Sequence, residues 1–186
     1  GSYTGVGDTN TLVPGCVGTF KRFVGRSFAA NFIGGAVVLQ GMDQADTIGL
    51  YTNMTGSLEA IATTSTPVPG EAFTFESLSP GGVAEGYAVF WGTSDGGTEE
   101  GFFRYRDGII TPIVQTGDVI GGGTVSDLGG AHESLEGNRL AFSAAFTDGS
   151  SAIMVTAAVP APASVWAGLG LLVILTVIRS YRRLAA

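Results

Sequence analysis

The sequence predicts an all-β protein built from tandem repeats and followed by a C-terminal transmembrane helix. Three observations support this prediction. Glycine accounts for 30 of the 186 residues, and valine, threonine and aromatic residues are frequent, which suits short strands joined by tight turns. A short motif recurs along the chain. No long segment before Val159 shows the apolar period of about 3.6 residues that marks an amphipathic helix.

The recurring motif divides residues 1–158, the β-repeat domain, into units at about 9–63, 64–115 and 116–158. It reads TNTLVPG, TSTPVPG and TGDVIGG in turn, and the copies start 55 and 52 residues apart. After each motif come a matching segment at 19–23, 74–78 and 124–128, then an apolar strand led by glycine, a polar glycine-rich loop and a further strand. These second and third strands are expected at 35–39 and 49–51, at 86–90 and 101–105, and at 137–142 and 152–155. A closing strand follows only in the first two units, at 57–62 and 109–114.

About four short strands in roughly 50 residues is the size of a kelch-type propeller blade. A sheet this small cannot bury both of its faces alone, so neighbouring units must stack on it. Three blades are too few for the usual ring of about four to eight. We therefore expect an incomplete propeller with blades missing before residue 1, or else an open array or sandwich of the same units.

The repeats resemble the tandem repeats found in many exported bacterial proteins of unassigned function. The resemblance covers residues from Thr9 to about Ala158, and the segments Gly49-Leu50-Tyr51 and Gly101-Phe102-Phe103 keep the "G-I-Y" element of those repeats. It implies an exported domain and names no ligand.

The charge distribution separates the repeats from the C-terminal segment. The part of the chain before Val159 holds all 16 acidic residues and six basic ones, a net charge of −10, and the remaining three arginines lie near the C-terminus. Nucleic-acid binding requires basic residues that neutralise phosphates, so an acidic body argues against a nucleic-acid partner. It suits a soluble, exported domain.

Three features follow the repeats in order: a Pro-x-Pro motif at 159–164, an uncharged apolar segment at 165–178 and a basic end at 179–186. The proline pair favours an extended backbone that a binding groove reads at low entropic cost. The apolar segment is predicted to be a transmembrane helix, and the arginine cluster marks its cytoplasmic end. The residues singled out are Val159, Pro160, Ala161, Pro162, Ala163, Ser164 and Trp166, with Arg179, Arg182 and Arg183 as the stop-transfer cluster.

This arrangement resembles the PEP-CTERM class of C-terminal sorting signals, and more closely its VPLPA variant. Val159, Pro160, Pro162 and Ala163 match that variant, and Trp166 occupies its common aromatic position. The resemblance implies export with a signal peptide and a pause in the inner membrane. An exosortase, a polytopic membrane cysteine peptidase, would then cut near the motif, and the product would reach the cell surface or extracellular matrix of a Gram-negative bacterium.

Residues that could carry chemistry are sparse. His132 is the only histidine and Cys16 the only cysteine, so a zinc site lacks its usual ligands and a catalytic triad lacks an orienting acid near His132. We expect a surface-loop histidine, an inert cysteine and no cofactor or metal. The carboxylates at 43 and 46, and those at 95, 99 and 100, do not have EF-hand spacing and are expected to lie in solvated turns.

We therefore expect a non-catalytic, exported surface or extracellular-matrix protein. An alternative is a propeller module that binds extracellular polysaccharide, because the strand period places Trp91 and Tyr105 opposite their apolar neighbours, where they could form an exposed sugar-stacking platform. A third hypothesis is a fragment of a secreted hydrolase whose catalytic residues lie in a missing N-terminal part.

Overall fold

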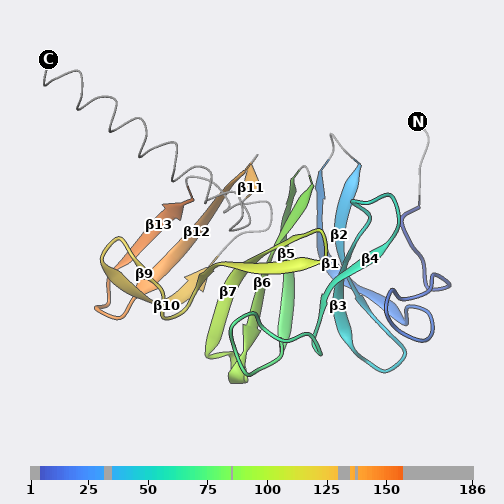
Figure 1. Cartoon of the computed structure of the whole chain (residues 1–186), viewed down its shortest axis with the longest axis horizontal. Helices are drawn as coiled ribbons and strands as arrows, with labels where there is room; N and C mark the ends of the chain where they lie inside the picture. Colours follow the sequence, from blue (N-terminus) through green and yellow to red (C-terminus); the bar gives the residue numbers. More distant parts are fainter. Residues whose placement is uncertain (1–4, 32–34, 85, 130–134, 137, 157–186) are drawn as a thin grey trace, which may run out of the picture.

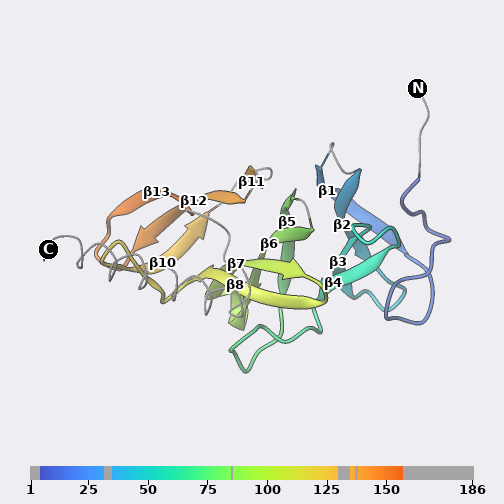
Figure 2. The ribbon, with the colours of Figure 1, turned by 45° about the horizontal axis from the view of Figure 1, so that its top comes forward.

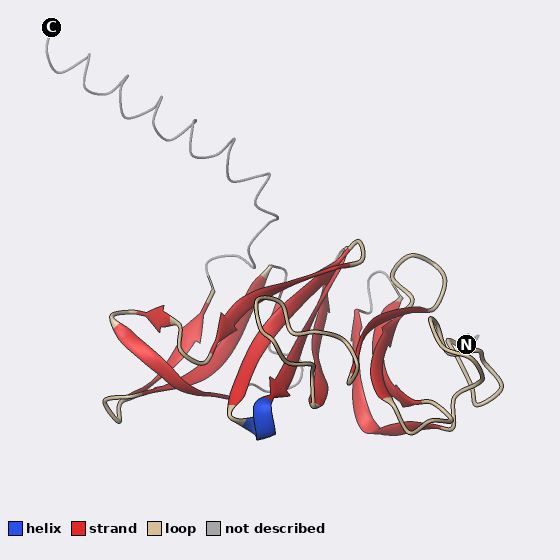
Figure 3. Ribbon diagram, turned by 60° about the horizontal axis from the view of Figure 1, so that its bottom comes forward, coloured by secondary structure: helices blue, strands red, loops and turns tan. Residues whose placement is uncertain are grey.

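A computed structural model describes residues 5–31, 35–84, 86–129, 135–136 and 138–156. These residues form three antiparallel sheets and one 3-10 turn, η1 (Asp95–Gly97), and they close no barrel. The prediction of an all-β protein is confirmed for them. Figure 3 shows that strands dominate the described part of the chain.

The predicted sorting motif at 159–164, transmembrane helix at 165–178 and basic end at 179–186 lie outside the described residues. Within the described ranges, no helix is long and apolar enough to cross a membrane.

The first two sheets are four-stranded, and their strands pair in chain order. Sheet 1 contains β1 (Arg22–Asn31), β2 (Ala36–Met42), β3 (Ile48–Thr52) and β4 (Glu59–Thr63). Sheet 2 contains β5 (Ser77–Ala84), β6 (Tyr87–Ser94), β7 (Glu99–Arg106) and β8 (Ile109–Gln115). Tight turns with positive backbone φ, such as Asp107-Gly108 between β7 and β8, connect the strands.

Sheet 3 has the same plan with an interrupted first strand. Its strands are β9 (Val119–Ile120), β10 (Gly123–Gly129), β11 (Leu135–Glu136), β12 (Arg139–Phe146) and β13 (Ser151–Val155). β10 pairs with 143–146 of β12, and β11 pairs with 139–140 of the same strand. Together, β10 and β11 therefore take the place that β1 and β5 hold in the other sheets. Among the described residues β13 pairs with β12 alone, and no strand follows it in the position of β4 or β8.

The three sheets lie side by side in chain order, from sheet 1 (blue) through sheet 2 (green) to sheet 3 (orange), in both Figure 1 and Figure 2. Each sheet buries apolar side chains against its neighbour. The core between sheets 1 and 2 contains Val38, Leu50, Ile61, Ala62, Val68, Phe75, Leu78, Ala88, Phe90, Phe103 and Tyr105. The core between sheets 2 and 3 contains Val89, Phe102, Val114, Val125, Leu128, Leu140, Phe142 and Ala144. Sheet 2 is thus covered on both faces.

The recurring sequence motif forms a hairpin before each sheet. Its strands meet at the bridges Leu12–Thr19 and Pro67–Thr74, and in the third unit as β9 with β10. At the start of each hairpin, a Thr or Asp side chain accepts a hydrogen bond from the backbone N–H three residues earlier. These pairs are Asp8 with Thr11 (2.9 Å), Thr63 with Thr66 (2.9 Å) and Gln115 with Asp118 (2.8 Å). Thr or Asp is therefore favoured at this position of the motif, because its side-chain oxygen accepts the hydrogen bond that closes the turn.

An aromatic ring from the hairpin lies over a glycine of the sheet. A Cβ atom added at Gly41 would come within 2.6 Å of the Phe20 ring, and one added at Gly92 within 2.7 Å of the Phe75 ring. By strand register, the corresponding pair in the third unit is Val125 and Ala144. There the hairpin residue is smaller, valine in place of phenylalanine, and the sheet residue is larger, alanine in place of glycine.

Replacing Gly92 with alanine should therefore lower the free energy of unfolding by about 1–3 kcal/mol, because the added methyl group overpacks the Phe75 ring. The penalty should shrink when Phe75→Val is introduced together with Gly92→Ala, since this double variant reproduces the third unit's pair. Urea denaturation of the two single variants and the double variant measures the coupling.

The control is Gly5→Ala, because nothing lies within 4 Å of an added Cβ atom there. Simple additivity of the Gly92 and Phe75 substitutions would contradict the proposed ring-on-glycine packing.

Candidate functional site

The residues predicted to form the sorting site, from Val159 to Trp166 and at Arg179, Arg182 and Arg183, lie outside the described residues, as does His132. The site that the structure does describe is therefore built from the repeat domain alone. Its polar side chains lie at four places: the turn between β2 and β3, the boundary between sheets 2 and 3, the boundary between sheets 1 and 2, and a buried arginine on β7.

The expected exposed platform of Trp91 and Tyr105 is wrong. Tyr105 is buried in the core between sheets 1 and 2, and Trp91 is partly buried against the core between sheets 2 and 3. The two side chains thus lie on opposite faces of sheet 2, and neighbouring sheets cover both faces. Period-two alternation separates the two faces of a strand, but it marks neither face as solvent-exposed when both are packed.

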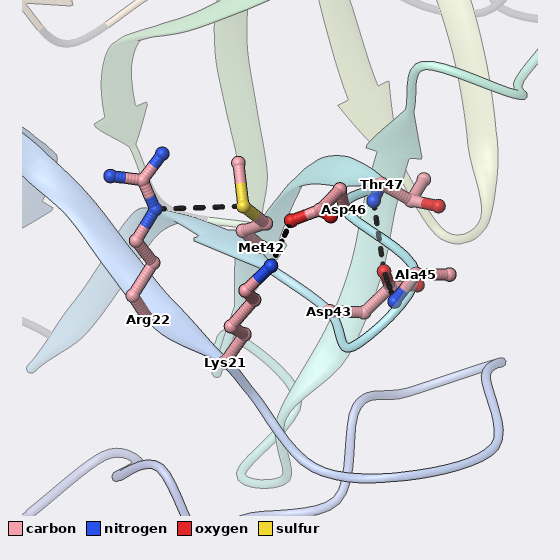
Figure 4. A network of polar contacts seen from close by, with 7 residues as sticks. All are labelled: Lys21, Arg22, Met42, Asp43, Ala45, Asp46 and Thr47. Atoms are coloured by element: carbon pink, nitrogen blue, oxygen red, sulfur yellow. Dashed lines mark hydrogen bonds and ion pairs between the residues drawn. The ribbon is translucent and has the colours of Figure 1, made fainter.

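The turn between β2 and β3 is organised by Asp43, as Figure 4 shows. Its carboxylate accepts hydrogen bonds from the backbone N–H groups of Ala45 and Thr47, each 2.8 Å long. Asp46 follows in the left-handed region at φ 63° and pairs with Lys21. The prediction of a solvated turn is right for the exposed Asp46 and wrong for Asp43, which is buried.

Cys16 is an exposed free cysteine that lies beside this turn, near Asp43. Burial raises the pKa of the Cys16 thiol, and the adjacent Asp43 carboxylate raises it further. Burial, with smaller contributions from Cys16 and Asp43, also raises the pKa of Tyr51 to about 12. Because the thiolate is the nucleophilic form of cysteine, this surrounding suits an unreactive thiol.

A carboxylate pair joins sheets 2 and 3. Glu100 of β7 lies against Asp127 of β10, accepts a hydrogen bond from the backbone N–H of Leu128, and also hydrogen-bonds to the Trp91 side chain. Burial raises the pKa of Glu100; the Leu128 hydrogen bond lowers it, and the charge of Asp127 raises it again, with a net upward shift. The Glu100 carboxylate thus links β7 of sheet 2 to the first strand of sheet 3.

The boundary between sheets 1 and 2 has a polar contact at the corresponding place. Gln40 of β2 donates a 2.7 Å hydrogen bond to the carbonyl oxygen of Leu78 on β5. By register, Gln40 corresponds to Trp91, and Leu78 corresponds to Leu128. At both boundaries, polar groups on one sheet therefore hold the backbone of the same residue in the next sheet's first strand.

Arg104 of β7 is a buried cation, with 4% of its surface exposed. Its Nε–H group has no hydrogen-bond partner, and no ion pair forms with it among the residues that the structure describes. Burial lowers the pKa of Arg104, and the neighbouring Arg106 lowers it further. A single Arg within a strand gave no sequence signal of burial, because arginine is ordinarily exposed.

Within the described ranges, no group of three or more His, Cys, Asp or Glu side chains is placed to hold a metal ion. The fold and these polar contacts define an all-β protein of stacked antiparallel sheets, in which Asp43 organises a turn and Glu100 joins two sheets. The chain matches no protein-family model, no curated protein and no solved structure.

The raised pKa of Glu100 predicts a pH-dependent stability. A carboxyl group whose pKa is higher in the folded than in the unfolded chain stabilises the fold at low pH. This contribution is lost as the pH rises above 4.5, the ordinary pKa of the group, and through its raised pKa in the folded chain. The stability of Glu100→Gln relative to wild type should therefore increase from about pH 4 to about pH 7.

Urea denaturation across this pH range measures the difference between the two proteins. The matched control is Glu99→Gln, which removes one charge from the exposed neighbouring residue and should follow the wild-type trend. A constant difference between Glu100→Gln and wild type at all pH values would contradict the assignment.

The burial of Arg104 predicts that replacing this residue with an uncharged one stabilises the protein. Replacing it with methionine keeps much of the side-chain volume and removes a buried charge that has no ion-pair partner among the described residues, so the free energy of unfolding should rise by on the order of 1 kcal/mol. Thermal and urea denaturation measure the change, with the more exposed Arg106→Met as the matched control. A loss of stability in Arg104→Met would show that the guanidinium makes a favourable interaction in the folded protein.

Proposed function

We propose that this chain is a non-catalytic, exported surface or extracellular-matrix protein whose C-terminal segment is a PEP-CTERM-like sorting signal. The observation that carries the proposal is an ordered series: an acidic β-repeat body, a Pro-x-Pro motif at 159–164, an uncharged apolar segment at 165–178, and an arginine cluster at 179–183. Each part has a separate physical role in export, recognition, membrane insertion and arrest of translocation.

The proposed partners are the inner membrane and an exosortase-type membrane peptidase. The apolar segment would hold the protein in the membrane with the repeat domain outside the cytoplasm, and Arg179, Arg182 and Arg183 would remain on the cytoplasmic side. The peptidase would bind the extended motif around Pro160 and Pro162. Cleavage there would release the repeat domain to the cell surface or matrix.

The chemistry of the repeat domain supports a non-catalytic role. Glu100 accepts a hydrogen bond from the backbone of the next sheet and lies near Asp127, and the pKa of the exposed Cys16 thiol is raised. Glu100 is thus engaged in a contact within the fold. In a glycoside hydrolase, the two catalytic carboxylates would instead flank the scissile bond.

The architecture also supports propeller-like repeats. Sheets 1 and 2 are four-stranded meanders, each sheet follows the same type of hairpin, and consecutive sheets pack through their faces. These are properties of propeller blades. In the proposed function, the stacked blades form a stable extracellular body that the sorting segment delivers.

The test is to change Pro160 and Pro162 together to alanine in the full chain, carrying a tag just before Val159, in a Gram-negative bacterium that makes an exosortase. Wild type should lose about the mass of its tail and leave the membrane fraction. The double variant should stay full-length in the membrane, because its motif no longer favours the extended backbone. Mass spectrometry of the membrane and released fractions measures both outcomes.

Pro67 and Pro69, changed together to alanine, form the matched control, because they belong to a similar Pro-Val-Pro sequence within the repeats. This control should be cut like wild type. If the wild-type protein stays full-length and membrane-bound, the tail acts only as a membrane anchor and is not cleaved. If the wild-type protein is full-length and soluble, the membrane-targeting proposal is wrong.

A further inference from the structure

The repeat extends upstream of the first motif. Residues 1–8 read GSYTGVGD and residues 56–63 read GSLEAIAT, which places 5–8 in register with 60–63 of β4, the closing strand of sheet 1. The turn that follows is closed by the same side-chain hydrogen bond in both copies. Residues 5–8, which we call the upstream segment, are thus the counterpart of a closing strand, although they belong to no strand in the described part of the chain.

A threonine after each closing strand fastens that strand to its sheet. In sheets 1 and 2 its backbone N–H donates a 2.9 Å hydrogen bond to a carbonyl oxygen near the start of the third strand; the pairs are Thr64 with Ile48 and Thr116 with Glu100. Thr9 is the third threonine at this position. By register its acceptor is the carbonyl oxygen of Ser151 on β13, and this bond does not form among the described residues.

Sheet 3 lacks the strand that the upstream segment resembles. Among the described residues β13 pairs with β12 alone. Ile153 of β13 is 78% exposed, whereas the residues in register with it, Leu50 and Phe102, are 0% and 2% exposed. Leu50 pairs with Ala62 of the closing strand, and the counterpart of Ala62 is Gly7. The described chain therefore carries three strands of a unit at one end of its stack and the counterpart of the fourth at the other end.

Within the chain, a hairpin-covered face packs on the position that Ile153 occupies. The hairpin residues are Val68 and Phe75 in the core around Leu50, and Val125 in the core around Phe102. Sheet 1 has the same kind of face, with the hairpin residues Val13 and Phe20 buried against Tyr51. This cluster contains no residue of another sheet, so the hairpin-covered face of sheet 1 is an unused copy of a surface that binds such positions elsewhere.

The upstream segment leads into this unused face. A Cβ atom added at Gly7 would lie 3.7 Å from the Phe23 ring and 3.8 Å from Leu58, and both side chains pack against the Phe20 cluster. In the same way, the closing strand of sheet 1 leads directly into the hairpin of the second unit. A copy that adds its upstream segment to β13 therefore also brings its hairpin-covered face onto Ile153.

Charged residues share the outer face of sheet 3, on which Ile153 lies, and the covered faces carry such residues too. Arg139 and Glu136 have opposite charges and pair with each other across β12 and β11. Two arginines hold corresponding positions in the other sheets: Arg22 of β1 corresponds to Asp127, and Arg104 of β7 corresponds to Val155. Packing of one sheet on the next therefore tolerates charges at these positions.

Sheets 1 and 3 lie at opposite ends of the stack in Figures 1 and 2, so one copy does not bring its upstream segment to its own β13. We propose that the upstream segment of a second copy adds to β13 as the closing strand of sheet 3, and that the hairpin-covered face of that copy's sheet 1 covers Ile153. The contact joins two different surfaces, so it closes only as a ring. Two copies with three described sheets each fall within the range of about four to eight blades of closed propellers, and three copies exceed it. The assembly is therefore a closed dimer.

Sedimentation velocity of the full chain in mild detergent tests the proposal, because the detergent disperses the apolar segment at 165–178. Wild type should be a dimer that dissociates on dilution. Thr9→Pro should raise the dissociation constant at least about tenfold, because proline lacks the N–H group that bonds to Ser151. Thr9 is the second residue of a turn closed by the Thr11 N–H and the Asp8 carbonyl oxygen, a position that proline favours, so the turn itself is kept. The matched control is Thr9→Ala, which retains the N–H group and should dimerise like wild type.

Ile153→Glu tests the other surface. A charge in the middle of the contact should also raise the dissociation constant at least about tenfold. Its matched control is Ile109→Glu, because Ile109 is 61% exposed at the start of β8 and lies outside both surfaces. A mixture of Thr9→Pro and Ile153→Glu should associate more tightly than either variant alone, because the intact β13 of the first meets the intact upstream segment of the second.

A monomeric wild type, open-ended polymers, or equal effects of Thr9→Pro and Thr9→Ala would each overturn the proposal. A mixture that associates no better than the separate variants would do the same, since a contact between two copies of one surface cannot be restored by mixing. If Thr9→Pro fails to fold, Ile153→Glu and its control decide the question, and equal dissociation constants for these two variants would overturn the proposal.

Discussion

Burial of apolar sheet faces against neighbouring sheets is the constraint on which the rest of this structure depends. A sheet of four short strands has two faces, and its own hairpin can cover only part of one of them. Sheet 2 satisfies both faces: Phe90 and Phe103 pack toward sheet 1, and Val89 and Phe102 pack toward sheet 3. The stacking order, the hairpin before each sheet and the small residues beneath Phe20 and Phe75 all serve this packing.

Polar contacts give the stacking its register. An apolar interface between two sheets has little directional preference, whereas a buried hydrogen bond fixes one position of the two surfaces. Gln40 holds the carbonyl group of Leu78 at the first boundary, and Glu100 holds the N–H group of Leu128 at the second. The two contacts hold equivalent residues of the next sheet's first strand, Leu78 and Leu128, but the side chains that hold them come from different strands and the direction of the hydrogen bond is reversed. Glu100, the partly buried carboxylate near Asp127, is therefore best understood as a structural contact between sheets 2 and 3.

The sequence allowed much of the fold to be predicted, because turn chemistry and strand composition are local. The repeated Thr and Pro-Gly positions identify hairpins whose turns need those residues, and the glycine-led apolar segments became β2, β6 and β12. Residues that meet across sheets were not predictable in this way. Glu100 and Asp127 are far apart in sequence, and only the packing of β7 beside β10 brings them together. The burial of Arg104 and Tyr105 and the partial burial of Trp91 were missed, because the pattern of a single strand does not tell how many of its faces a neighbouring sheet covers.

The stacking also has a consequence for cooperativity. When each unit contacts only its neighbours, the unfolding free energy divides into a term for each unit and a term for each boundary. Sheet 2 shares two boundaries, whereas within the described residues sheet 3 shares one and has an interrupted first strand. Opening of the end unit therefore breaks one boundary, whereas opening of the central unit breaks two. Amide hydrogens of β12 and β13 should then exchange through partial opening that leaves β6 and β7 intact, so local stability is lower in this unit than in the central one.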